Sequence, residues 1–178
     1  MMSLTPFDEA RWVFGYASLI WRPDFEYREQ SVARLDGFRR VLWQGSPDHR
    51  GTPDAPGRVA TLTRDASATC GGMAFRLVDA TRRATLRALD DREQGGYARE
   101  MVDVTLADGR RVPALTYIGW PDNPHFLGPA SEHDIVDHVR RSHGPSGPNT
   151  DYVVNLARAL DDLAMPDPVL ARLARQLA

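Results

Sequence analysis

The sequence has 178 residues, 26% of them charged and 42% hydrophobic, with a formal net charge of −2. This length suits one domain with one core, so we expect a single domain over residues 1–178. The nearly balanced charge argues against a nucleic-acid-binding groove as the main function. No run of about 18 apolar residues is present, so no membrane-spanning helix is expected, and residues 1–9 lack the pattern of a secretory signal. Cys70 is the only cysteine, which excludes an intrachain disulfide and fits a cytoplasmic location.

Strand-like segments dominate the first two-thirds of the sequence. Short runs of apolar, β-branched and aromatic residues predict strands at residues 12–16, 31–35, 38–43, 57–63, 71–77, 97–106 and 110–117. Asp36-Gly37 and Ala107-Asp108-Gly109 separate neighbouring strands, and each predicts a hairpin.

Helices are expected between and after these strands. Capping residues and helical spacing predict them at residues 79–92, 131–139 and 149–163, and from Pro168 onward. The expected N-caps of the first three are Asp79, Ser131 and Asn149. Strands early and helices late indicate an α+β fold, or a small barrel flanked by helices.

The longest irregular segment runs from Gln44 to Gly57 and is rich in glycine, proline and polar residues. A loop of this length in a compact domain is usually either functional or disordered. Its polar residues, Ser46, Asp48, His49 and Arg50, make a role at a site one of two open interpretations.

The segment Gly15–Ile20 ends an apolar strand in small residues. Such a turn exposes successive backbone N–H groups, which can hold a carboxylate or a developing oxyanion. An ordinary strand-to-loop turn would have the same sequence, and the residues alone leave both interpretations open.

Glu93 lies at the expected end of the first helix. Carboxylates are disfavoured near a helix C-terminus, and Asp90 lies three residues earlier on the same face. Both effects would raise the pKa of Glu93, which suits a proton shuttle, whereas Arg92 would oppose them if it folded back. A solvated charged turn is the alternative.

No residue pattern indicates a metal or a cofactor. His133 and His138 are five residues apart, not the four that place two ligands on one helical face. Cys70 lies in a strand-like run and is expected to be buried and inert. No Gly-x-Ser-x-Gly elbow supports a serine nucleophile.

Four segments resemble, in order, the signature blocks of the ChaC family of glutathione-specific γ-glutamylcyclotransferases. They are residues 12–21 (Trp-Val-Phe-Gly-Tyr-Ala-Ser-Leu-Ile-Trp), residues 38–52 continued by Pro56-Gly57-Arg58-Val59, residues 91–97 (Asp-Arg-Glu-Gln-Gly-Gly-Tyr) and residues 147–152 (Gly-Pro-Asn-Thr-Asp-Tyr). The resemblance implies a small mixed β-barrel with flanking helices.

The same resemblance implies a set of site residues. Glu93 corresponds to the family's catalytic glutamate. The implied substrate-binding residues are Gly15, Tyr16, Ala17, Ser18, Leu19 and Ile20 in the loop, with Gln44 and Tyr152 lining the pocket. The family usually has glycine where this chain has Ala17, which puts the fit of the loop in question.

The implied reaction cleaves glutathione into 5-oxoproline and cysteinylglycine, with no metal, cofactor, nucleic acid or membrane involved. Two alternatives stay open. The enzyme could act on other γ-glutamyl amino acids or amines, or the chain could be a non-catalytic binding or regulatory protein on the same fold.

Overall fold

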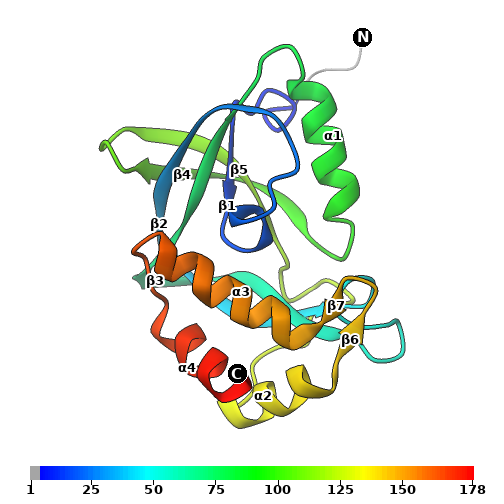
Figure 1. Cartoon of the computed structure of the whole chain (residues 1–178). Helices are drawn as coiled ribbons and strands as arrows, with labels where there is room; N and C mark the ends of the chain where they lie inside the picture. The colour runs from blue at the N-terminus through cyan, green and yellow to red at the C-terminus, as the bar shows by residue number, and fades with distance from the viewer. Residues whose placement is uncertain (1–4) are drawn as a thin grey trace. The chain divides into compact units, whose positions relative to one another are not determined.

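The computed structural model describes residues 5–178 (Figure 1). Residues 1–4 lie outside the described residues, and they are part of the segment that is expected to lack a secretory signal. The chain divides into two compact units. The first unit comprises the chain up to Arg39 together with Arg64–Ile118, and the second comprises Arg40–Thr63 and Gly119–Ala178.

Five strands form a closed barrel in the order β1-β3-β2-β4-β5. Their bounds are β1 Trp12–Gly15, β2 Tyr27–Ser46, β3 Gly57–Leu77, β4 Ala98–Leu106 and β5 Arg111–Ile118. β1 pairs antiparallel with β3 and parallel with β5, so the barrel is mixed. The expectation of an α+β fold built on a small mixed barrel is confirmed.

The core of the first unit lies among β1, β3, β4 and β5. The largest of the hydrophobic side chains with less than 2% exposure there are Val13, Phe14, Phe75, Leu77, Val104, Leu115 and Ile118. The hairpin predicted at residues 107–109 is confirmed, since β4 and β5 pair from Ala98 opposite Ile118 to Thr105 opposite Arg111.

The hairpin predicted at Asp36-Gly37 is wrong, because β2 runs through both residues without a turn. Gly37 takes a φ of 82° inside the strand, a value that glycine adopts at little cost. The Asp36 carboxylate accepts a hydrogen bond from Thr69 Oγ1 on β3 at 2.8 Å. The segments 57–63 and 71–77 are likewise one strand, β3.

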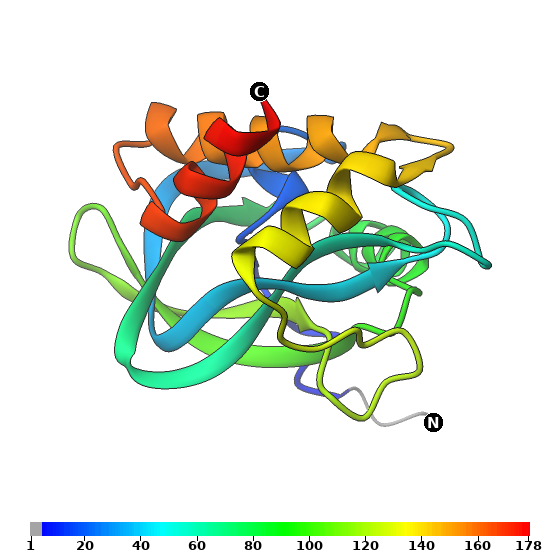
Figure 2. The same ribbon diagram turned by 90° about the horizontal axis from the view of Figure 1, so that it is seen from below.

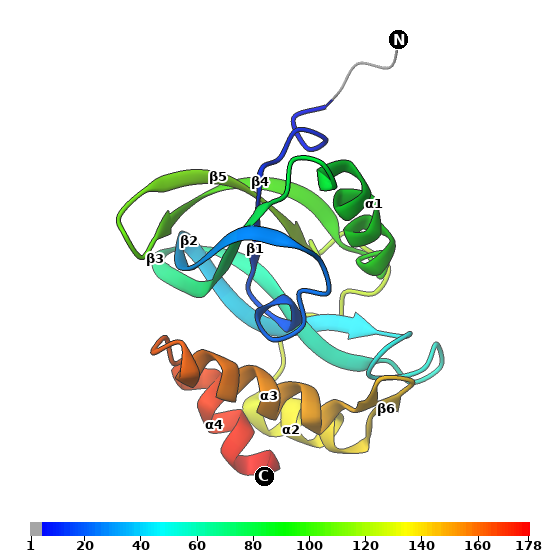
Figure 3. The same ribbon diagram turned by 45° about the horizontal axis from the view of Figure 1, so that its top comes forward.

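The helix α1 (Arg82–Arg92) belongs to the first unit and lies beside its strands (Figure 3). It begins later than predicted, with Thr81 as the N-cap residue instead of Asp79. The Asp79 carboxylate is instead within ion-pair distance of Arg28 and Arg82, at 3.3 and 3.4 Å.

Three helices and a short hairpin belong to the second unit, together with the end of β2 and the start of β3. The helices α2 (Glu132–Arg141), α3 (Asn149–Asp162) and α4 (Pro168–Leu177) lie side by side (Figure 2). The hairpin joins β6 (His143–Gly144) to β7 (Gly147–Pro148). Within residues 5–178, no helix has both the length and the hydropathy needed to cross a membrane.

The helix starts of the second unit confirm two predictions and correct one. Ser131 Oγ accepts from the Asp134 backbone N–H at 3.1 Å, as expected of an N-cap, and α4 begins at Pro168. Asn149 is the first residue of α3 rather than its cap. Its buried amide instead accepts from the Arg58 N–H at 2.7 Å and donates to the Arg58 carbonyl at 2.8 Å. The Asn149 side chain thus pairs both backbone polar groups of the buried residue Arg58.

Candidate active site

The segment after β1 folds back tightly onto the strand. A Cβ on Gly15 would lie 2.6 Å from Leu19 Cβ, so only glycine fits there. The Tyr16 hydroxyl donates to the Tyr117 carbonyl at 2.6 Å, which fixes the start of the segment to β5. We call Gly15–Ile20 the β1 loop; it ends in a short 3-10 helix, η1, at Ser18–Ile20.

The β1 loop leaves several backbone donors unused. Its own turn uses the N–H groups of Ile20 and Arg22, which donate to Ala17 O at 2.9 Å and Ser18 O at 2.8 Å. Within the described part of the chain, the N–H groups of Ala17, Ser18 and Leu19 donate no hydrogen bond. Successive free N–H groups of this kind can hold a carboxylate or an oxyanion. These N–H groups could therefore bind a carboxylate or an oxyanion, which is one of the two interpretations that the sequence left open.

Glu93 ends α1 as its C-cap residue, with its N–H donating to Leu89 O at 2.9 Å. Its side chain is 19% exposed. The Arg92 guanidinium does fold back toward it, with Nε 3.9 Å from Glu93 Oε1. The condition under which Arg92 was expected to oppose the effects of the helix end and of Asp90, a side chain folded back toward Glu93, is thus met.

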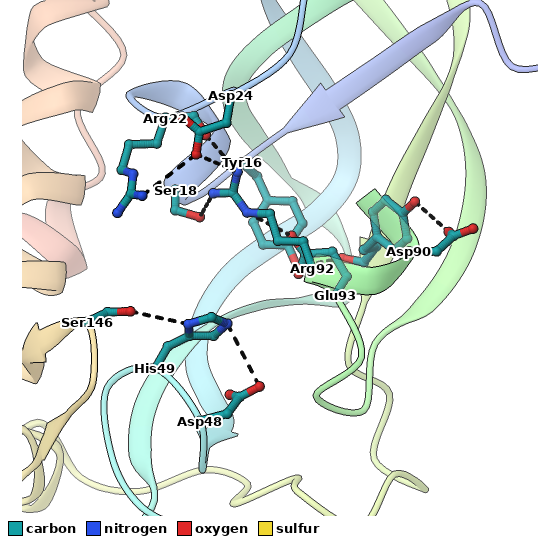
Figure 4. A network of polar contacts seen from close by, with 11 residues as sticks. Tyr16, Ser18, Arg22, Asp24, Asp48, His49, Asp90, Arg92, Glu93 and Ser146 are labelled. Carbon is teal, nitrogen blue, oxygen red and sulfur yellow. Dashed lines mark hydrogen bonds and ion pairs between the residues drawn. The ribbon is translucent and has the colours of Figure 1, made fainter. Parts of the chain in front are cut away.

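Arg92 also reaches the β1 loop (Figure 4). Its Nη2 donates to Ser18 Oγ at 2.9 Å, and its Nη1 donates to the Arg22 carbonyl at 2.8 Å. Ser18 and Arg92 are 74 residues apart in the sequence. One arginine therefore connects the candidate substrate-holding loop with the candidate catalytic carboxylate inside the first unit.

Asp90 is held by two partners on the neighbouring strands. Arg99 on β4 makes an ion pair with its carboxylate, and the Tyr117 hydroxyl on β5 donates to Asp90 Oδ1 at 2.8 Å. The positive charge of Arg99 compensates Asp90, which weakens the repulsion of Glu93 that was expected from Asp90. Burial raises the pKa of the Tyr117 phenol well above its usual value; Arg99 opposes this rise, and the nearby Glu93 charge adds to it.

Gln44 and Tyr152 are both buried in the second unit. Gln44 is fully buried on β2, where its amide and that of Asn123 exchange hydrogen bonds at 2.9 and 3.0 Å. The Tyr152 hydroxyl accepts from the Ala60 N–H at 3.0 Å, and the Arg50 guanidinium lies 5.8 Å from its ring centre. These contacts give both side chains a packing role, and their role in substrate binding stays a prediction.

The loop between β2 and β3 holds no serine–histidine–aspartate triad. His49 Nδ1 lies 3.2 Å from Ser146 Oγ (Figure 4). His49 Nε2 and Asp48 Oδ2 are 3.8 Å apart, too far for a hydrogen bond, and both side chains are more than half exposed. The arrangement lacks the buried, oriented carboxylate that such a triad needs.

Other reactive groups are scarce in the described part of the chain. Residues 5–178 contain no cluster of three or more histidine, cysteine, aspartate or glutamate side chains that could hold a metal ion. Cys70 is 2% exposed on β3, as expected for an inert thiol.

Sequence reasoning missed the links that organise this region. It considered Arg92 only as a charge beside Glu93 and overlooked its bonds to Ser18 and Arg22. It also missed Arg99 and Tyr117, because their partner Asp90 reaches them only once α1 lies against β4 and β5. The adjacency of an arginine to a candidate acidic residue was the one available signal.

Comparisons with known proteins find matches to both the fold and the sequence of this chain. A crystal structure of a yeast γ-glutamylcyclotransferase described as specific to glutathione matches with a TM-score of 0.86 and 30% identity, covering 94% of this chain and 95% of that one. Among sequences, γ-glutamylcyclotransferase 2-3 of Arabidopsis thaliana is 40% identical over 176 residues, which is 94% of this chain and 88% of the relative. Glutathione-specific γ-glutamylcyclotransferase 1 of Danio rerio is 39% identical over 150 residues, covering 82% and 76% of the two chains.

The barrel and its flanking helices thus have the γ-glutamylcyclotransferase fold. Residues 11–177 match the family described as ChaC-like protein. The chain belongs to the ChaC-like family.

Proposed function

We propose that this protein is a γ-glutamylcyclotransferase that cleaves glutathione into 5-oxoproline and cysteinylglycine, with Glu93 as the proton-transfer residue. The observation that carries the proposal is the Arg92 link, which brings Glu93 and the unused N–H groups of the β1 loop into one connected network. The names of the Danio rerio and yeast relatives support glutathione as the substrate. A cytoplasmic location is part of the proposal, since a chain with one cysteine suits a reducing compartment.

The reaction needs no external nucleophile. The α-amine of the γ-glutamyl group attacks the γ-carbonyl carbon of the same residue, and a five-membered lactam closes. One C–N bond forms, the C–N bond to cysteine breaks, and one proton passes from the attacking amine to the departing amine. Because the nucleophile is tethered, well-oriented closure can gain on the order of 10⁵ M in effective molarity.

Protein groups then have two tasks. Glu93 takes a proton from the α-amine and returns it to the cysteinyl nitrogen, a contribution of typically ~10²–10⁴-fold. The N–H groups of Ala17, Ser18 and Leu19 hold either the substrate α-carboxylate or the oxyanion that develops on the γ-carbonyl oxygen. Single-domain organisation and the lining roles of Gln44 and Tyr152 are part of the same proposal.

A broader substrate range is the second candidate. The names of two Arabidopsis thaliana relatives state γ-glutamylcyclotransferase without naming glutathione. The chemistry of lactam closure is identical for any γ-glutamyl amide, so only contacts with the leaving half can separate the two candidates.

The test incubates purified protein with glutathione and measures 5-oxoproline and cysteinylglycine by mass spectrometry. We expect both products in equal amounts. The Glu93→Gln variant keeps the side-chain shape without the ionisable group, so its turnover should fall by at least ~10²-fold. Its melting temperature should stay the same or rise slightly, because a carboxylate at a helix C-terminus is removed.

Two outcomes would contradict these assignments. Near-normal turnover by the Glu93→Gln variant would remove Glu93 from the reaction. Equal or faster turnover of γ-glutamylalanine at the same concentration would replace glutathione with the broader substrate class.

A further inference from the structure

The side chain of Arg92 contacts four residues of the first unit, three of them in the stretch from Ser18 to Asp24. It donates to Ser18 Oγ and to the Arg22 carbonyl, and it lies beside Glu93. Its Nη1 is also 3.6 Å from the carboxylate of Asp24, a residue with a φ of 57°. The Arg92 side chain is only 24% exposed. An arginine with this many directed contacts is more than a solvated surface charge.

The geometry of these contacts depends on a guanidinium. Two different nitrogens of one planar group serve Ser18 and Arg22, while Nε faces Glu93. Lysine offers one compact ammonium on a flexible stem, so it can keep the charge but not the spread of donors. Charge and geometry at position 92 are therefore separable by substitution.

We infer that Arg92 is a positioning residue for the cyclotransferase reaction, which holds the β1 loop in register with the Glu93 carboxylate. This inference rests on the proposed function, because it assigns a role to Arg92 in that same site. Arg92 acts through Ser18, Arg22 and Glu93 and takes no proton itself.

The inference has a geometric part and an electrostatic part. The hydrogen bonds to Ser18 and Arg22 fix where the free N–H groups of the β1 loop lie, which governs substrate placement. The charge of Arg92 favours the ionised form of Glu93. Other charged or titratable groups near this pair in the first unit include Asp24 with its ion-pair partner Arg22, the neighbouring Asp91, Tyr117 and the compensated pair of Asp90 with Arg99.

The main experiment compares Arg92→Gln and Arg92→Lys with the native protein for glutathione turnover. Arg92→Gln loses both parts, so kcat/KM should fall by ~10–10²-fold, the scale of a misplacement of about 1 Å. The acid limb of its kcat/KM profile should move to higher pH, since the positive charge 3.9 Å from the Glu93 carboxylate is lost. Arg92→Lys should keep the native acid limb and lose activity mainly through a higher KM.

Arg87→Gln is the matched control, because Arg87 is exposed on the same helix and forms no ion pair within residues 5–178. It should retain native kcat, KM and pH profile. The melting temperatures of the Arg92 variants should stay within about 4 °C of native, since only partly exposed contacts are lost. A loss of activity that follows a loss of stability, with an unmoved pH profile and no difference between Lys and Gln, would overturn the inference.

A double-mutant cycle isolates the link to the loop. In a Ser18→Ala background the acceptor for Nη2 is gone, so Arg92→Gln should raise KM by a smaller factor than it does in the native background. Additive effects on KM would show that Arg92 does not act through Ser18.

Hydrogen exchange gives a readout that does not depend on turnover. The N–H groups of Ile20, Trp21 and Arg22 are hydrogen-bonded inside the turn, so their exchange reports opening of the loop. Arg92→Gln should speed this exchange several-fold, while Arg87→Gln should not. If the native protein forms no 5-oxoproline, the proposed function fails, but hydrogen exchange still tests the link between Arg92 and the β1 loop. Unchanged exchange in the Arg92→Gln variant would reject that link whatever the activity.

Discussion

Ala17 takes a φ of −140° at the entry to η1. An L-residue adopts this φ without the cost of the left-handed region, which is roughly 1–2 kcal/mol. The φ of Ala17 therefore gives no reason for glycine at this position, although its ψ of −126° lies outside the main α and β regions. The space that the methyl group occupies could also affect a substrate.

The Ala17→Gly variant tests whether that methyl group matters. We expect kcat/KM for glutathione to change by less than about tenfold, which is ~1.4 kcal/mol of barrier, because the loop has already accommodated a Cβ at negative φ. The measurement is steady-state kinetics of the native and variant proteins side by side. A gain of several orders of magnitude would instead mean that the native protein is a disabled cyclotransferase and that a binding role is the better assignment.

Among the elements, the two long strands differ most from what the sequence indicates. Asp36-Gly37 has the composition of a hairpin turn, yet β2 continues through it. A local turn signal cannot reveal whether the flanking segments pair with each other or with strands elsewhere in the barrel. Here β2 pairs with β4, for example at Ala33 opposite Leu106, so tertiary pairing overrides the local preference.

Glycines at two strand positions predict losses of stability of different size when a methyl group is added. At Gly37 a Cβ would meet no atom within 4 Å, so Gly37→Ala should cost only the ~1–2 kcal/mol of its positive φ. At Gly72 a Cβ would lie 2.3 Å from the Gly15 carbonyl oxygen and 2.9 Å from the Phe14 ring. Gly72→Ala should therefore cost ~3 kcal/mol or more, at the upper end of overpacking effects.

Urea unfolding followed by tryptophan fluorescence measures both costs. Gly72→Ala should also lower cyclotransferase activity in folded protein, because Gly15 begins the β1 loop, whereas Gly37→Ala should keep native activity. Equal losses of stability in the two variants would contradict the close approach of β3 to Gly15.

How far the sequence predicts the candidate site depends on the kind of contact. Glu93 and the β1 loop are recognisable because their short motifs are contiguous in the chain. The link through Arg92 and the Asp90–Arg99–Tyr117 cluster depend on how α1 lies against β4 and β5, which no local pattern encodes. Asn149 is a similar case. Its residue type and position predict a helix N-cap, but in the folded chain its side chain binds the backbone of Arg58.

At the scale of the whole molecule, the two compact units are not consecutive along the chain. The chain passes from one unit to the other inside β2, inside β3 and at the end of β5. Two of these crossings occur within a continuous strand, where a flexible linker between independent domains is not possible. This continuity supports the proposal of a single domain over residues 1–178.

A single domain predicts one cooperative unfolding transition. Leu115 on β5 and Leu156 on α3 are both 0% exposed, one in each unit. Either leucine-to-alanine change should cost ~2–5 kcal/mol. At about 2–4 °C per kcal/mol for a chain of this size, either should lower the midpoint of the whole transition by roughly 4–20 °C. Calorimetry of both variants, with the ratio of calorimetric to van't Hoff enthalpy, makes the measurement. If the units unfold independently, each variant will shift only part of the heat absorption, and the trace will split into two peaks whose order depends on which leucine was changed.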